Sequence, residues 1–370
     1  CNSCAFVCPH ATIRPFVLTD EEVAAAPENL RTLDAMGPKV KGMKFTLAVS
    51  PLDCMGCSVC VSACPKDALT MVPTEGELPE QDVFDYCVSK VAEKPEAIAA
   101  NTKGSQFKQP LLEFSGSCAG CAETSYARLV TQVCGDRMFI SNATGCSSIW
   151  GNPAATSPYT VNKCGHGPAW NNSLFEDNAE HGLGFEVGYK AVQNKLVSDT
   201  EALIASDGVS EGVKAAAQAW LDNRNDTEGS KTAAAEYIKA LEENGSDAAK
   251  AVLADKSYLT KKSFWIFGGD GWAYDIGFGG LDHVLASNHN VNVFVFDTEV
   301  YSNTGGQASK ASNLGQVAQF AAAGKVTKKK TLAEIAMTYG YVYVAQVAMG
   351  ANPAQTLKAI QEAEAYDGPS

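Results

Sequence analysis

The chain of 370 residues is 45% hydrophobic, and its 29 Lys and Arg against 42 Asp and Glu give a formal charge of -13. Its length suggests two or three domains, since one domain commonly takes about 100–200 residues. The acidic balance and the lack of a basic run exclude nucleic acid as an expected partner, and no stretch of about 18 apolar residues predicts a membrane span or membrane partner.

The 13 cysteines gather mainly in short motifs. Disulfide frameworks concentrate in small secreted domains, whereas closely spaced cysteines in a long chain without a signal region more often hold metal. A reducing, cytoplasmic location fits this pattern best. The sequence begins inside such a motif and without an initiator Met, which suggests a segment of a longer protein.

Two cysteine runs in the first 65 residues predict iron–sulfur clusters. One has the spacing C-x2-C-x2-C-x3-C-P, which holds four-iron clusters, and the other reproduces its last three cysteines. Because the fourth cysteine of such a run binds the other cluster, we predict crossed ligand sets. The first set is Cys8, Cys54, Cys57 and Cys60, and the second is Cys1, Cys4, Cys64 and a cysteine upstream of this sequence.

Structural zinc is the main alternative, because zinc also accepts four thiolates and often uses C-x2-C pairs. Zinc gives no reason for the run to recur with a proline after each last cysteine. Disulfides are a weaker alternative, so we favour two iron–sulfur clusters.

The stretches around these runs carry weaker signals. Residues 11–53 are long for a ferredoxin loop and are expected to form an ordered excursion. Residues 68–109 mix Pro, Glu and Lys without clear periodicity, which favours a domain boundary near residue 100.

Beyond this boundary, short apolar runs predict buried strands at residues 138–140, 264–267, 291–296 and 341–344. Strands alternating with helices favour a mostly parallel α/β sheet, whose ligands gather at the carboxyl ends of the strands. From residue 195 to 262 the composition turns to Ala, Glu and Lys with apolar residues at helical spacing, which predicts a peripheral helical insertion.

A glycine turn, GGDG at 268–271, follows one predicted strand and leads into a helical pattern. Such a turn lets backbone amides face a phosphate, and Asp270 is placed to bridge to it through Mg²⁺, which prefers oxygen ligands. The loop at 297–307 follows the next strand, and parallel neighbouring strands would bring Thr298 beside Asp270. A hairpin is the alternative, but the helical pattern disfavours it. The sequence therefore predicts a diphosphate-plus-metal site.

A third cysteine group consists of Cys118, Cys121 and Cys146, and it lacks a fourth member. A redox dithiol is the alternative for the C-x2-C pair. Cys87, Cys134 and Cys164 are expected to be core thiols, although Cys134 and Cys164, or a cysteine past residue 370, could supply the missing ligand. A third cluster stays an open alternative on spacing alone.

Taken together, the motifs resemble those of the single-chain pyruvate:ferredoxin (flavodoxin) oxidoreductases, which depend on thiamine diphosphate. The resemblance spans essentially the whole chain. It rests on the two ferredoxin runs, CAGC at 118–121, TGCSS at 144–148, CGHGPAW at 164–170, SLFEDN at 173–178, GGDGW at 268–272 and DTEVYSNTGGQ at 297–307. It implies a small α+β ferredoxin-like domain with two [4Fe-4S] clusters at 1–100, and an α/β thiamine diphosphate-binding domain at 101–370.

The resemblance also implies roles for single residues. Asp270, Thr298 and the Val300 carbonyl would hold Mg²⁺, with Thr298 in place of the Asn of most thiamine enzymes. Asn303 would approach the thiazolium and the substrate as the catalytic residue. The cofactor would be bordered by Glu123, Cys146, Gly269, Gly271 and Trp272, of which Trp272 is expected mainly to pack. A third cluster would be held by Cys118, Cys121, Cys146 and a cysteine after the C-terminus.

The implied activity is oxidative decarboxylation of pyruvate with coenzyme A to acetyl-CoA and CO2, with electrons passing through the clusters to ferredoxin or flavodoxin. A homodimer and further domains are implied, and this segment is expected to be inactive alone. The alternatives are an oxidoreductase for another 2-oxoacid, an electron-transfer module without thiamine chemistry, and a zinc-stabilised interaction protein. His166 and His181 are candidate general acids, with a structural loop role as the alternative.

Overall fold

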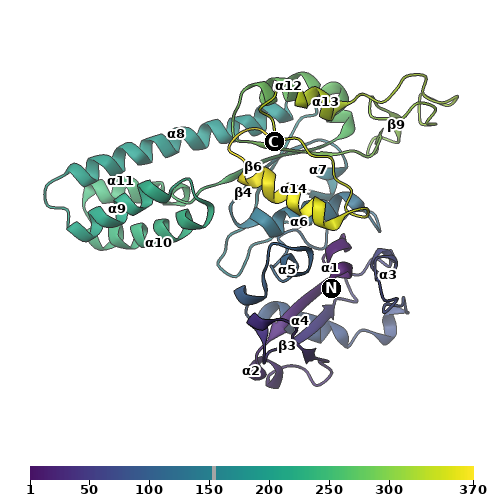
Figure 1. Cartoon of the computed structure of the whole chain (residues 1–370), viewed down its shortest axis with the longest axis horizontal. Coiled ribbons are helices and arrows are strands. Elements are labelled where there is room, and N and C mark those ends of the chain that lie inside the picture. The colour runs from purple at the N-terminus through teal and green to yellow at the C-terminus, as the bar shows by residue number, and fades with distance from the viewer. Residues whose placement is uncertain (152–155) are drawn as a thin grey trace.

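An antiparallel sheet of three strands forms the N-terminal part of the computed structural model, which describes residues 1–151 and 156–370 (Figure 1). Its order is β1-β3-β2, made of β1 (Ile13–Leu18), β3 (Lys44–Val49) and the short β2 (Leu33–Asp34). Helix α4 (Glu80–Lys90) packs on this sheet through Val83, Phe84 and Cys87. The α+β class expected for this part is confirmed.

The expected ordered excursion at 11–53 contains all three strands and α2 (Asp20–Ala24). By contrast, helix α4 was not expected, because the sequence at 68–109 shows no clear periodicity. The remaining elements here are short: α1 (Ser3–Val7), α3 (Val59–Ser62), α5 (Thr102–Ser105), and single 3-10 turns at Pro38–Val40, Thr74–Gly76 and Pro95–Ala97. Helices α1 and α3 carry the two cysteine runs and pack against each other.

The second sheet is parallel, with the order β5-β4-β6-β7. Its strands are β4 (Met138–Ala143), β5 (Ala169–Ser173), β6 (Ser263–Gly269) and β7 (Asn292–Phe296). Side chains of β6 alternate between two cores, because successive residues of a strand point to opposite faces. Trp265 and Phe267 join α6 (Ala122–Cys134) and α14 (Pro353–Ala365), whereas Phe264 and Ile266 join α8 (Asn178–Ala205) and α12 (Phe278–Ala286).

The expected mostly parallel sheet is thus confirmed, and three of its four predicted strands are present as β4, β6 and β7. The strand expected at 341–344 is wrong. Val342 and Val344 do pack against a core, but the edge of β7 is bonded instead by Ser370, whose carbonyl accepts from the Val293 N–H at 2.9 Å. Strand β5 was not expected, because its sequence AWNNS is polar and mostly exposed at the sheet edge.

Helices α9 (Glu211–Asn223), α10 (Thr227–Asn244) and α11 (Asp247–Ala254) pack with the far part of α8 and project away from the sheet (Figure 1). Their core centres on Trp220, which stacks on Tyr237 with ring centroids 5.9 Å apart and donates to the Leu259 carbonyl at 2.8 Å. The apolar residues at helical spacing that predicted this insertion include those at 213–221, which lie on α9, and those at 234–241, which lie on α10. Within the described residues, no helix is long and apolar enough to cross a membrane.

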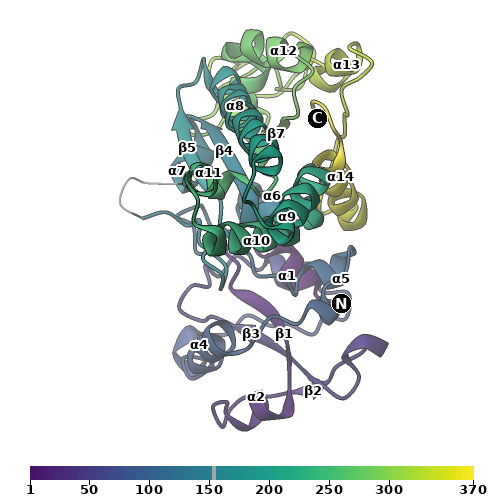
Figure 2. The ribbon, with the colours of Figure 1, turned by 90° about the vertical axis from the view of Figure 1, so that its left-hand side faces the viewer.

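The two parts of the chain meet around α1 and α5, which lie between the two sheets (Figure 2). Arg128 of α6 is 2% exposed and reaches across this junction. Its Nε donates to the Cys8 carbonyl at 3.0 Å, its Nη2 donates to the Phe6 carbonyl, and its Nη1 donates to the side chains of Gln106 and Gln132. The guanidinium therefore fixes the N-terminal cysteine run, called the first cysteine run below (Cys1, Cys4 and Cys8), against α6.

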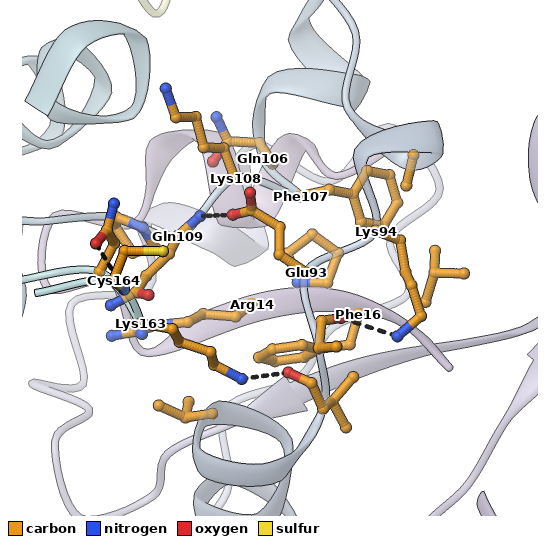
Figure 3. A pocket seen from close by; sticks show the side chains of 18 residues that line it. Arg14, Phe16, Glu93, Lys94, Gln106, Phe107, Lys108, Gln109, Lys163 and Cys164 are labelled. Atoms are coloured by element: carbon orange, nitrogen blue, oxygen red, sulfur yellow. Dashed lines mark hydrogen bonds between the residues drawn. The ribbon is translucent and has the colours of Figure 1, made fainter. Parts of the chain in front are cut away.

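A pocket beside β1 shows further contacts across the junction (Figure 3). Lys163 donates to the Val91 carbonyl, and the Gln109 N–H donates to the Glu93 carboxylate at 3.2 Å. Arg14 pairs with Glu113. The cations of this pocket are therefore held by groups of the chain itself.

Cys164 lies at this pocket and is exposed, so its expected place in the core is wrong. It belongs to a tight surface turn, in which the Asn162 side chain accepts from the N–H groups of Cys164 and His166. Cys87 and Cys134 are fully buried, as expected.

Replacing Arg128 with Met should loosen the first cysteine run. The carbonyls of Phe6 and Cys8 would lose their donors, and each buried acceptor without a partner costs about 1–3 kcal/mol. Hydrogen exchange followed by mass spectrometry should show faster exchange at residues 2–10. The exposed Arg31, replaced with Met, is the matched control. Equal exchange in Arg128→Met and Arg31→Met would contradict the assigned role.

Candidate functional site: an oxygen cluster and three cysteine groups

The carboxyl ends of β6 and β7 bring Asp270 and Thr298 together. Gly269 pairs with Phe296 across the two strands, so the loops that follow begin side by side. The Thr298 N–H and hydroxyl donate to Asp270 Oδ1 at 3.3 and 2.9 Å, and the hydroxyl oxygen lies 3.1 Å from the Val300 carbonyl oxygen. The expected contact between the two loops is present, and three oxygen ligands converge.

Asp270 is a buried carboxylate in acidic surroundings. It is 1% exposed, and burial raises its pKa, although donation from Ser309 and Thr298 opposes the shift. Asp297, which itself pairs with Lys329 at 2.7 Å, raises the pKa of Asp270 further, and the described hydrogen-bond partners of Asp270 include no Lys or Arg side chain. A divalent cation beside Oδ1 would supply the missing positive charge, and the three oxygens are the donor type that Mg²⁺ prefers. The residues therefore fit a magnesium ion.

The glycine turn after β6 is tightly packed. A Cβ atom at Gly271 would lie 2.5 Å from ring carbons of Tyr301, and one at Gly268 would lie 2.4 Å from the Trp272 ring. Trp272 is buried, in keeping with the packing role expected for it. A π-helical turn at Gly271–Ile276 and then α12 follow, so the alternative of a hairpin is excluded.

A cleft of about 360 Å³, including its open mouth, lies beside this oxygen cluster. Every residue predicted to border the cofactor lines it except Thr298, which reaches the cleft through its contact with Asp270. Phe175, which was not predicted, also lines it and stacks on Tyr301 at 6.0 Å. Apolar walls and a polar end are the usual form of a small-molecule site.

Glu123 lies in the first turn of α6 and contributes a second acid to the cleft. It is 8% exposed, and its carboxylate accepts from Trp150 Nε1 at 2.7 Å. Burial raises the pKa of Glu123, the bond from Trp150 lowers it, and Asp270 raises it again. Burial is the largest of these effects, so the pKa of Glu123 lies above its ordinary value.

The third cysteine group borders the same cleft. Cys146 Sγ lies 3.1 Å from the Ser302 hydroxyl, which belongs to the loop that follows Thr298. Cys121 and Cys118 lie close enough to raise the pKa of Cys146, after the larger effect of burial. Cys134 is at the opposite end of α6 from Cys121, about 20 Å away by helical rise, so it cannot be the fourth ligand. Cys164 lines a different pocket.

The other two predicted cysteine sets lie in the N-terminal part of the chain. A small cavity is lined by all four thiols of the predicted first set, Cys8, Cys54, Cys57 and Cys60. The pKa of Cys60 is raised by burial and then by the other three thiols, as expected where four thiols converge. Cys4 is likewise influenced by Cys64, its predicted partner in the second set, and Cys1 is exposed.

The cysteine groups come close to each other at Gly120, in the loop between Cys118 and Cys121. Its φ is +78°, and a Cβ atom there would lie 3.5 Å from the Cys57 Cβ. The loop between Cys118 and Cys121 therefore lies close to Cys57 of the first set, with room for little more than one added methyl group between them. In the described parts of the chain, no three His, Cys, Asp or Glu side chains are placed to hold one single metal ion.

His166 and His181 lie outside the cleft. His181 Nδ1 is 2.8 Å from the Ser141 hydroxyl of β4, and its ring packs edge-on against Phe185. His166 is exposed in the turn at 162–166. The structural alternative therefore describes both residues better than the general-acid one.

Sequence reasoning missed the residues that support the site. Trp150, Ser302 and Ser309 bind Glu123, Cys146 and Asp270, but a serine or tryptophan in a loop carries no distinguishing signal. Arg128 did carry one, because it stands directly between the apolar residues Ala127, Leu129 and Val130.

Comparison with known proteins gives matches along the whole chain. Residues 234–370 match the family model described as thiamine pyrophosphate enzyme, C-terminal TPP binding domain, and residues 1–68 match the 4Fe-4S dicluster domain. All of the chain aligns with pyruvate:ferredoxin oxidoreductase of Moorella thermoacetica (54% identity) and pyruvate-flavodoxin oxidoreductase of Klebsiella pneumoniae (53%), over 32% of each. It also aligns with mitochondrial pyruvate dehydrogenase (NADP(+)) of Euglena gracilis at 50% identity, over 21% of that protein. The chain spans a third or less of the length of these relatives.

Replacing Gly271 with Ala should distort the cleft, whereas replacing Gly269 should not. The new methyl group at Gly271 would displace the Tyr301 ring, and overpacking of this kind costs about 1–3 kcal/mol. At Gly269 the closest atom is the Phe296 carbonyl oxygen at 4.0 Å. Thermal unfolding of both variants tests this, and equal melting temperatures would show that the turn is not tightly packed.

Proposed function

The chain corresponds over its whole length to a segment of the pyruvate:ferredoxin and pyruvate-flavodoxin oxidoreductases, and we propose that it serves their reaction by binding thiamine diphosphate and carrying electrons away through iron–sulfur clusters. The reaction is the oxidative decarboxylation of pyruvate with coenzyme A, with ferredoxin or flavodoxin as acceptor. One observation carries this proposal: Cys146 contacts the cofactor loop at Ser302 and also belongs to a cysteine group.

The diphosphate end of the cofactor is assigned to the oxygen cluster. Asp270, Thr298 and the Val300 carbonyl would hold Mg²⁺, which neutralises the buried carboxylate and the diphosphate together. The turn at 269–271 places backbone N–H groups beside this position. Bound thiamine diphosphate supplies the electron sink that decarboxylation of a 2-oxoacid needs.

The reactive end of the cofactor is assigned to the part of the cleft lined by Glu123, Cys146 and Asn303. Glu123 would hold a proton more tightly than an exposed glutamate does, because burial raises the pKa of its carboxyl. Asn303 would orient the substrate with its amide. Phe175 and Trp272 exclude water from this end, which strengthens each polar contact inside.

Electrons would leave the cleft through the cysteine groups in their order of contact. Cys118, Cys121 and Cys146 would hold the first cluster to be reduced, with a fourth ligand from outside this chain. Gly120 brings that group against Cys57 of the next set. The set that contains Cys4 and Cys64 follows, since Cys60 lies close to Cys4. Three clusters in series take one electron at a time, as ferredoxin requires.

Replacing Asp270 with Asn should abolish binding of Mg²⁺ and thiamine diphosphate. In the intact protein, a ligand at 100 times its Kd stabilises by about 2.7 kcal/mol, seen as a higher melting temperature. Asp270→Asn should lose this rise because the amide cannot balance the cation. Asp282→Asn is the control, since its amide can still accept from Tyr339. A full rise in Asp270→Asn would overturn the assigned cofactor site.

Replacing Cys57 with Ser should remove one cluster. Iron and acid-labile sulfide in the anaerobically purified intact protein should each fall by about four per chain. Cys87→Ser is the matched control, because burial raises the pKa of the Cys87 thiol to about 12 and it lines no cysteine cavity. Zinc in place of iron in the unaltered protein would reject the cluster assignment and favour a structural metal site.

A further inference from the structure

His10 is a buried side chain beside the first cysteine set. It follows Cys8 and Pro9, is 2% exposed, and lines the cavity shared by Cys8, Cys54, Cys57 and Cys60. The segment that precedes Cys118 fixes the backbone of His10, because the Phe114 N–H donates to the His10 carbonyl at 3.0 Å. The imidazole is therefore held in place at the edge of this cavity.

The Nε2 atom of His10 makes no hydrogen bond with any described residue. Backbone hydrogen bonding at Ser115 and Cys118 acts on the imidazole and opposes the fall in pKa that burial causes, whereas Nε2 has no hydrogen-bond partner among the described residues. A buried polar atom without a partner costs about 1–3 kcal/mol, and in native proteins such atoms are few. An acceptor from outside the chain would remove this cost.

The chemistry of the cavity indicates what that acceptor is. The Thr12 hydroxyl, the side-chain donor nearest in sequence, lies 3.3 Å from Cys8 Sγ and so is already engaged with a ligand thiol. Sulfide and thiolate sulfurs of an iron–sulfur cluster accept hydrogen bonds, and such bonds are among the features that set cluster potentials. His10 Nε2 is thus an unpartnered nitrogen on a residue that lines a site whose expected occupant has only acceptors.

We propose that His10 donates a hydrogen bond from Nε2 to a sulfur of the cluster held by Cys8, Cys54, Cys57 and Cys60, and thereby raises its reduction potential. The proposal rests on the proposed function for the presence of that cluster. Reduction adds one electron and no proton, so the reduced cluster carries one more negative charge. The hydrogen bond stabilises this form more than the oxidised one. The cluster would then draw electrons from the group at Cys118, whose loop lies close to Cys57 at Gly120.

The test is an EPR-monitored redox titration of the intact, anaerobically purified protein. His10→Leu and His10→Phe both remove the donor, and Phe keeps most of the ring volume. Each should make reduction of this cluster about tenfold less favourable, a fall of about 59 mV for a one-electron couple. His10→Gln keeps an N–H donor and should restore most of the potential. His283→Leu, at an exposed histidine of α12, is the matched control and should change nothing.

The Cys57→Ser variant shows which midpoint potential belongs to this cluster. Full iron content with an unchanged potential in His10→Leu or His10→Phe would overturn the proposal, as would a shift confined to another cluster. If the cluster is lost in Leu and Phe but kept in Gln, the need for a donor is supported. Loss in all three variants would overturn it, because the ring and not its N–H would then be required. Absence of iron from the unaltered protein would instead reject the proposed function.

Discussion

One guanidinium sets the relation between the cysteine groups and the cofactor cleft. Arg128 donates to the carbonyls of Phe6 and Cys8 from the middle of α6, and the same helix begins at Cys121 and Glu123. The helix therefore holds a thiol of the third group and a cleft acid at one end, and the first cysteine run on its side. A buried Arg is costly to desolvate, and here several acceptors offset that cost. The proposed electron transfer would need short and constant distances, and a rigid helix provides them.

A second constraint comes from the buried carboxylate of Asp270. An ionised group out of water is unfavourable unless a partner of opposite charge accompanies it. Among the described residues, Asp270 accepts only from two hydroxyl groups and one backbone N–H, and the nearby Asp297 is paired with Lys329. The site is thus unfavourable by itself and becomes favourable with a cation. Because Thr298 donates to Asp270 and its hydroxyl oxygen lies 3.1 Å from the Val300 carbonyl oxygen, the oxygens are already in place before a ligand arrives, which lowers the cost of ordering them.

The sequence predicted the features that depend on spacing and missed those that depend on packing. The cysteine runs allowed the crossed sets to be proposed, because the loop geometry of a four-iron site leaves few other spacings. Asp270 and Thr298 could be paired because parallel strands align their carboxyl ends. Strand β5 could not be found, since an edge strand with a polar sequence has no hydrophobic signal. The strand predicted at 341–344 is wrong, because Val342 and Val344 can be buried without pairing with another strand. Cys164 was misplaced because a thiol in a surface turn has no marker beyond the glycine that follows it.

A buried polar atom without a hydrogen-bond partner indicates a missing ligand only where the residues around it also fit that ligand. Within the described residues, Trp272 Nε1, Tyr159 Oη and His10 Nε2 are all buried without partners. The Trp272 ring packs closely against Gly277, which leaves no space for a ligand at its nitrogen. Tyr159 stacks on Trp170 and lines none of the cysteine cavities. His10 alone of these three lines a cavity of converging thiols, whose contents would carry negative charge and only acceptors. An N–H that faces such a group is stabilised by it. An N–H packed against carbon atoms, as in Trp272, only loses its hydrogen bond. The cavity, and not the missing hydrogen bond by itself, is therefore what makes His10 informative.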